Sequence, residues 1–143
     1  MWKDKNLTFS SRQELVNFGG GVVGEALDLD QKNALGEGRG FFLVLASDGA
    51  MTATGDPVIH FDLEHADNPA FTNARRDRVF SGLAKTDFGA NGKLLVQTCP
   101  MGIQRYVRLV METNLPIACV DFTAMLTIDA QTNDRGVELR GRQ

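Results

Sequence analysis

The feature of the sequence that most constrains the fold is an alternation of apolar and more polar residues near the C-terminal end. Every second residue from Ala118 onward is apolar, namely Ala118, Val120, Phe122, Ala124, Leu126 and Ile128. A helix would spread these side chains around its circumference, whereas a strand places them on one face because successive side chains point to opposite sides. The alternation therefore predicts a long strand with one face against a core.

Four further segments have the composition of strands. Val58–Glu64 repeats the alternation in a shorter form, and Phe41–Ala46 is a continuous apolar run that predicts a strand buried on both faces. Ile103–Met111 and Lys93–Gln97 are the other two, and Asn91-Gly92 before the latter is a favoured hairpin turn. Short strands separated by turn residues predict an antiparallel sandwich or barrel.

Helical signals are short. Ser11 and Glu14 have the spacing of a capping box, but Gly19-Gly20-Gly21 follows closely, so we expect a helix of at most two turns there. The segment 73–87 fits a short helix or a strand equally well, since Val79, Phe80 and Leu83 suit both. The expected class is therefore all-β, with at most one or two short helices.

Composition narrows the class of protein. A chain of 143 residues is one domain in length, and we expect a single domain over 1–143. The net charge of −3 argues against nucleic acid as a partner, and the arginines at 75, 76 and 78 are interpreted as a solvated surface. Without an apolar run of about 20 residues, no membrane span is expected. The start of the chain lacks a signal peptide's apolar stretch, so Cys99 and Cys119 are expected as free thiols in a reducing cytoplasm.

The patterns that suggest chemistry each have a simpler structural interpretation. Gly19–Gly24 matches G-x-G-x-x-G, but no long helix follows, so a glycine-rich turn is favoured over a nucleotide site. His60, Asp62, Glu64 and His65 are spaced as metal ligands could be on a strand, yet they also suit a solvent-facing strand. Neither cysteine has a nearby base. We therefore expect no catalytic residue, cofactor or metal.

Two features suggest a binding surface. Trp2 is the sole tryptophan and lies in a polar N-terminal arm, where it packs on its own sandwich or anchors a neighbour. Arg105, Tyr106 and Arg108 form a basic-aromatic strand of a kind that stacks single-stranded nucleic acid, an interpretation that the acidic balance disfavours. The alternation places Arg105 on the face of Val107 and Leu109, as a paired and partly buried charge.

Taken in order, four stretches give the chain a family resemblance. A Phe-Ser pair leads into a Gln-containing segment; an acidic-apolar stretch leads through glycines to the buried run; a strand ends in Asp-Asn-Pro-Ala-Phe; and a Pro-x-Gly turn precedes Arg-Tyr-x-Arg-Leu. These stretches are Leu7–Gln13, Leu27–Leu29 with Gly36–Gly38 and Phe41–Val44, Val58–Phe71, and Pro100–Leu109. In their order and spacing they resemble the cementing, or decoration, proteins of tailed-bacteriophage capsids.

This resemblance implies a jelly-roll sandwich that forms a homotrimer on the outside of the phage head. The implied partners are other copies of the chain and the major capsid protein, and the implied location is the virion surface, after synthesis in the bacterial cytoplasm. The family brings no catalytic residues. Within the single domain, we expect residues 1–10 to form an N-terminal arm and residues 130–143 a C-terminal tail. Candidates for a partner contact are Trp2, Cys119 and Met125, the latter two on the polar side of the last strand.

Two other classes remain as alternatives. A carbohydrate-binding jelly roll or tail adhesin would need exposed aromatic rings, and the chain has one Trp and one Tyr. A metal-dependent enzyme of the cupin type would need His60 or His65 as a ligand of iron or zinc.

Overall fold

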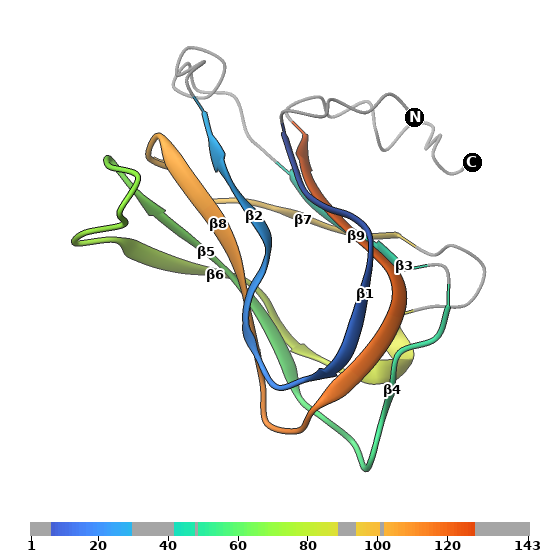
Figure 1. Cartoon of the computed structure of the whole chain (residues 1–143). Coiled ribbons are helices and arrows are strands. Elements are labelled where there is room, and N and C mark those ends of the chain that lie inside the picture. Colours follow the sequence, from blue (N-terminus) through green and yellow to red (C-terminus); the bar gives the residue numbers. More distant parts are fainter. Residues whose placement is uncertain (1–6, 30–41, 48, 89–93, 101, 128–143) are drawn as a thin grey trace.

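The chain folds, in a computed structural model, into two antiparallel sheets that pack face to face (Figure 1). The structure describes residues 7–29, 42–47, 49–88, 94–100 and 102–127. One sheet has the order β1-β9-β3-β7, with β4 also paired to β9, and the other has the order β2-β8-β5-β6. The strands are β1 (Thr8–Phe18), β2 (Gly21–Asp28), β3 (Phe42–Ser47), β4 (Thr52–Ala53), β5 (Ile59–Ala66), β6 (Arg75–Leu83), β7 (Leu94–Thr98), β8 (Tyr106–Thr113) and β9 (Ile117–Thr127).

This strand order is that of a jelly roll. When the short β4 is set aside, the first strand pairs with the last, the second with the second-last, and so on inward, giving β1·β9, β2·β8, β3·β7 and β5·β6. A chain folded double in this way and then rolled up forms two four-stranded sheets. The expectation of an antiparallel jelly-roll sandwich is confirmed.

The core lies between the two sheets and is centred on phenylalanine rings. Phe61 of β5 stacks on Phe122 of β9, with ring centroids 5.9 Å apart and an interplanar angle of 9°. Phe88 lies against both rings at a tilt, and Phe80 meets Phe61 edge-on. Leucine, isoleucine and valine side chains of both inner faces surround these rings. Because Phe61 and Phe122 come from different sheets, their contact ties the sandwich together.

The long C-terminal strand differs from its predicted pattern in one half. Phe122, Ala124 and Leu126 face the core as expected, but Val120 is exposed and Cys119 is buried. The cause is a β-bulge: Gln13 pairs with Phe122 and Leu15 with Cys119, so two residues of β1 match three of β9, and Asp121 has a φ of 57°. The extra residue reverses which side chains point inward. The placement of Cys119 on the polar face was therefore wrong.

Two other expectations near the N-terminus are also corrected. The segment after Ser11 is part of β1 rather than a short helix, because its backbone pairs with β9 along its length. Residues 8–10, assigned to the N-terminal arm, belong to the same strand. The segment 73–87, for which helix and strand were equally expected, contains β6 and a 3₁₀ turn, η2 (Lys85–Asp87). The tail 130–143 lies outside the described residues.

Gly24 explains the glycine-rich segment in structural terms. It lies in β2 with a φ of +72°, and a Cβ atom there would be 2.0 Å from the carbonyl oxygen of Phe9. The two strands approach too closely at this point for any side chain. Gly20 and Gly21, with φ of +108° and +127°, serve the predicted turn between β1 and β2, whereas Gly24 serves the close approach to Phe9 within the strand.

We predict that Gly24→Ala destabilises the fold far more than Gly82→Ala. Gly82 has nearly the same φ, +73°, but a Cβ atom there would have no neighbour within 4 Å, so it isolates backbone strain from steric overlap. Gly82→Ala should cost about 1–2 kcal/mol, and Gly24→Ala at least about 2 kcal/mol more because Phe9 must move. Urea unfolding measures both values, and equal costs would contradict the close approach.

Candidate functional site

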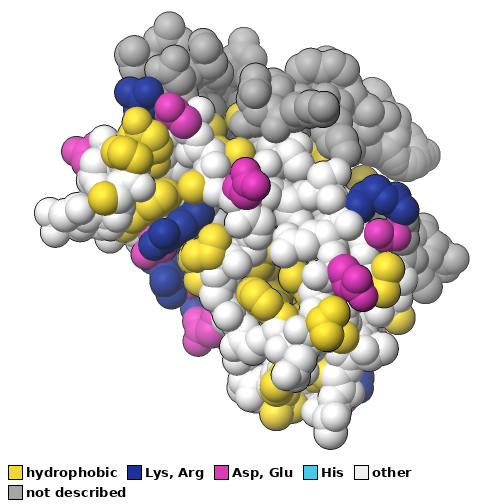
Figure 2. All heavy atoms as spheres, viewed as in Figure 1, with side chains coloured by type: hydrophobic (Ala, Val, Ile, Leu, Met, Phe, Trp, Pro, Cys, Tyr) yellow, Lys and Arg dark blue, Asp and Glu magenta, His cyan; other side chains and the backbone are white. Residues whose placement is uncertain are grey.

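The outer face of the four-stranded sheet carries a dense group of charged side chains. They alternate with core residues along three adjacent strands: Asp62 and Glu64 on β5, Arg76 and Arg78 on β6, and Arg108 and Glu112 on β8. We call these six residues, together with Asp28, Phe71, Arg105 and Tyr106 at one end, the arginine face. Figure 2 shows basic and acidic side chains next to one another along this side of the molecule.

The six central charges form one continuous chain of ion pairs. Arg78 contacts Glu112 and donates from Nε to Asp62 Oδ1 over 2.8 Å. Arg76 lies 3.9 Å from Asp62 and 3.7 Å from Glu64, and so bridges the two carboxylates. Arg108 Nε then donates to Glu64 Oε1 over 2.6 Å. Cations and anions alternate from one end to the other, which makes the network electrostatically coherent.

Two carboxylates of the network lie deeper than the arginines that they pair with. The side chains of Asp62 and Glu64 are 3% and 16% exposed, whereas those of Arg76, Arg78 and Arg108 are 48%, 40% and 32% exposed. The hydrogen bond to Asp62 raises the pKa of Arg78, so its positive charge is fixed. Asp62 and Glu64 thus lie beneath guanidinium groups, whereas Glu112 and Asp28, which are 56% and 45% exposed, share the surface with the arginines.

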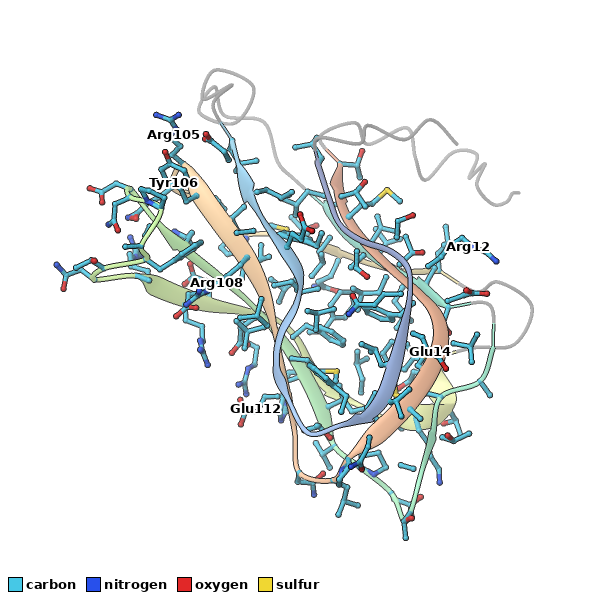
Figure 3. The ribbon with its side chains drawn as sticks, in the orientation of Figure 1. Arg12, Glu14, Arg105, Tyr106, Arg108 and Glu112 are labelled. Atoms are coloured by element: carbon cyan, nitrogen blue, oxygen red, sulfur yellow. The ribbon has the colours of Figure 1, made fainter. Side chains whose placement is uncertain are left out.

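The upper end of the face adds aromatic rings. Arg105 makes two hydrogen bonds to the carboxylate of Asp28, at 2.7 and 3.0 Å, which lower the pKa of that carboxyl. Its guanidinium also lies 5.0 Å from the ring centre of Tyr106. Figure 3 shows Arg105, Tyr106, Arg108 and Glu112 following one another down β8. Arg105 is therefore paired as expected, but it is half exposed on the outer face because β8 begins only at Tyr106.

Phe71 is held beneath Arg108 by the loop between β5 and β6. The Asn68 side chain accepts hydrogen bonds from the backbone N–H groups of Ala70 and Thr72 and donates to the Thr72 carbonyl. This fixes Phe71 with a φ of 57°, and the Arg108 guanidinium lies 4.1 Å from its ring centre. A bulky residue in this left-handed region is strained, and the hydrogen bonds of Asn68 hold the loop in this conformation.

The four residues considered as metal ligands are divided between the two sides of the sheet. Asp62 and Glu64 are engaged in the ion pairs of the outer face, and His60 Nδ1 accepts from the Gly82 N–H. His65 points into the core, where Nδ1 accepts from the Gln104 N–H and Nε2 lies 2.8 Å from Asp77. In the part of the chain that the structure describes, no group of three His, Cys, Asp or Glu side chains is arranged to hold a metal.

His65 and Asp77 have the composition of a catalytic dyad but the setting of a structural one. The His65 side chain is 1% exposed, and both ring nitrogens are engaged. Because Nδ1 accepts a hydrogen bond, Nε2 carries the proton and donates it to Asp77. The pair thus ties β5, β6 and the segment before β8 to one another, and the His65 ring is closed to a substrate.

The three candidates for partner contacts have different outcomes. Trp2 lies outside the described residues. Cys119 is in the core, where burial raises its pKa, and burial likewise raises the pKa of Cys99 to about 12. Met125 pairs with Val44 on the outer face of the five-stranded sheet, as predicted, but it is only 6% exposed. Of the three, Cys119 is excluded as a surface contact.

Sequence reasoning missed the arginine face, although a signal for it exists. Arg76 and Arg78 are exposed, as a solvated surface requires, but they also pair with carboxylates on the neighbouring strand, which the sequence analysis did not predict. Asp62 and Glu64 have the same two-residue spacing and the opposite charge, as cross-strand partners require. Recognising this needs the knowledge that β5 and β6 are adjacent.

Comparisons with known proteins bear on the family and the fold. The sequence matches the model of the Bbp16 family over residues 10–126. No curated protein matches the chain. Among solved structures, the chain is similar to the CBM22-1 xylan-binding domain of Paenibacillus barcinonensis Xyn10C, with a TM-score of 0.42 and 11% identity over 73% of this chain. The match spans 65% of that domain, less than two thirds, and likeness at this level says nothing of a ligand.

One result concerns membranes. No helix in the described ranges is long and apolar enough to cross a bilayer.

We predict that Arg78→Met destabilises the protein by about 1–3 kcal/mol, because it removes the hydrogen-bonded partner of a buried carboxylate. Arg76→Gln should cost less than about 1 kcal/mol, since its contacts are longer and Asp62 and Glu64 keep Arg78 and Arg108. Thermal and urea unfolding compare the two variants. Equal losses of stability would show that the depth of Asp62 does not matter.

We predict that both thiols resist alkylation in the native protein. Burial of Cys99 and Cys119 favours the protonated thiol, and the thiolate is the reactive form. Iodoacetamide at mildly alkaline pH followed by mass spectrometry should find no label on the native protein and a label on each cysteine in denaturing urea. Rapid labelling of Cys119 in the native state would restore it to the surface.

Proposed function

The chain belongs to the Bbp16 family, and we propose that it is a structural protein that cements a bacteriophage head from the outside. The observation that carries the proposal is the arginine face. Arginine and aromatic residues are enriched at the centres of protein interfaces, and here they are already held in place before a partner arrives. A preorganised surface loses little conformational freedom on binding.

The chemistry of the described residues supports a binding role rather than a catalytic one. The charged groups of the arginine face neutralise one another, His65 is enclosed, and both thiols are buried in the protonated form. An active site needs a reactive group that a substrate can reach. None of these groups meets that condition, so we propose that the protein is not an enzyme.

The resemblance to decoration proteins supplies the partner and the assembly. In this proposal the protein binds the major capsid protein on the outer surface of the head, as a homotrimer. Three copies of one modest contact, held on a rigid jelly roll, would bind much more strongly than one copy. Closed three-fold symmetry would limit the assembly to a fixed size.

The described aromatic rings weigh against the carbohydrate-binding alternative. Arg105 covers Tyr106 and Arg108 covers Phe71, so guanidinium groups occupy the ring faces on which a sugar would stack. A hollow of about 690 Å³ lies between β1 and β2, but Phe9, the ring among its described lining residues, is 3% exposed. A glycan array gives the direct comparison.

We predict that heads assembled without this protein bind it on their outer surface and then retain their DNA to a higher temperature. Image reconstruction with and without added protein should show extra density that fits the jelly roll, and DNA release on heating should shift upward. Heads that acquire no density would refute the proposal.

The mass of the pure protein tests the trimer separately. Sedimentation equilibrium should give three times the 15.6 kDa of the chain. Another closed assembly that still decorates heads would replace the trimer and leave the cementing role in place.

A further inference from the structure

We propose that the edge strand β7 is an interaction surface and that its partner is β7 of a second copy of this chain. In this contact the two strands lie antiparallel about a two-fold axis, and the two five-stranded sheets join into one. The inference is drawn from the edge itself and goes beyond the proposed function. On a head, the same contact would link one trimer to the next.

The other long edge strands have features that prevent a further strand from adding. The two sheets end in β1 and β7, and in β2 and β6. β1 and β2 contain register shifts and left-handed residues, among them Arg12 and Gly24. β6 also contains register shifts, and it carries Arg75, Arg76 and Arg78. Bulges, bends and charges are the means by which proteins block pairing at a sheet edge.

β7 has none of these features. Its sequence, Leu-Leu-Val-Gln-Thr over Leu94–Thr98, contains neither a charge nor a proline. All five residues pair with β3 without a register shift, and none has a positive φ. Within the part of the chain that the structure describes, no strand pairs with its other side. A straight, uncharged edge of this kind is a template for another strand.

The strand is complementary to itself in one register. Opposed residues of an antiparallel pair point to the same face of the sheet, so the two-fold axis must pass through a residue. An axis at Val96 places Val96 opposite Val96, Leu95 opposite Gln97, and Leu94 opposite Thr98. All five residues then pair, whereas an axis at any other residue leaves some of them unpaired. The opposed side chains are uncharged, so no like charges repel.

An apolar row on the outer face of the sheet ends at this edge. Val44 of β3 pairs with Met125 of β9 on one side and with Val96 of β7 on the other. Met125 and Val44 are 6% and 2% exposed, whereas Val96 is 41% exposed. A two-fold axis at Val96 continues the row into the second copy and buries its exposed end. Removal of this apolar surface from water favours the contact.

The size of the contact sets its strength. A five-residue strand is too short to bury the roughly 800 Å² per partner of a standard interface. Pairing is therefore weak in dilute solution and becomes effective where copies are held side by side, as on a shell. It uses the free edges of both copies, so it ends at two.

Cross-linking locates the contact. Val96→Cys, treated with a short bismaleimide, should give covalent dimers in a yield that rises with protein concentration. The control is Val16→Cys on β1, where Val16 is 68% exposed. It should give roughly tenfold less dimer, because only paired cysteines are held at a high effective concentration. Cys99 and Cys119 are buried and should not react. Equal yields from the two variants would overturn the inference.

A charge at the axis tests the register. Sedimentation of the unaltered protein should show a mass that doubles from its dilute value as concentration rises. Val96→Lys places like charges opposite each other and should need at least about tenfold more protein for the same rise. Val16→Lys should behave as the unaltered protein, and thermal unfolding checks that both variants fold. A constant mass up to about 1 mM, or equal behaviour of both variants, would contradict the pairing.

Amide hydrogen exchange distinguishes a second copy from other occupants of the edge. In dilute protein, the β7 N–H groups that β3 does not bind should exchange rapidly, and in concentrated protein they should be protected. Protection of all five amides of β7 in dilute protein would show that another segment of the chain already covers the edge, and the inference would be wrong.

Binding to heads separates this inference from the proposed function. If the protein pairs in solution and no head binds it, the capsid role fails and the pairing stands. If heads bind the protein but Val96→Cys cross-links no better than Val16→Cys, in solution and on heads alike, the pairing fails and the capsid role stands. Preferential cross-linking of Val96→Cys on decorated heads would support both.

Discussion

The stack of Phe61 on Phe122 is the contact on which the rest of the structure depends. It joins the two sheets at the centre of the sandwich and fixes which face of β5 points inward. Because side chains alternate along a strand, burying Phe61 and Leu63 forces Asp62 and Glu64 to the outside. The arginine face is thus a consequence of the core: a slip of one residue in β5 would bury the carboxylates among the rings.

The all-β class could be predicted from the sequence because it depends on local alternation. Val58–Glu64 and Phe41–Ala46 have this pattern within a few residues, and the structure contains strands at both places. The segment after Ser11 was misjudged because a capping-box spacing is also local, and pairing with β9 outweighs it. Local patterns identify a strand well when its own side chains alternate between apolar and polar. They identify it poorly when the strand forms only because it pairs with a distant strand.

The features that escaped prediction all depend on contacts between distant parts of the chain. The bulge at Asp121 arises where two residues of β1 pair with three of β9, and it turns Cys119 into the core. Arg78 becomes the partner of Asp62 only because β6 lies beside β5. Single-residue properties contain neither fact, although opposite charges at equal spacing on two strands give a usable hint of the second.

The irregular edge of the five-stranded sheet limits how copies of the protein can associate. β1 is an edge strand of that sheet, and Arg12 and Asn17 within it have left-handed backbone angles of 53° and 48°. A strand bent at two points offers no straight row of N–H and C=O groups for another strand to join. At high local concentration, as on a crowded surface, this edge is therefore a poor template for the strand-by-strand growth of fibrils.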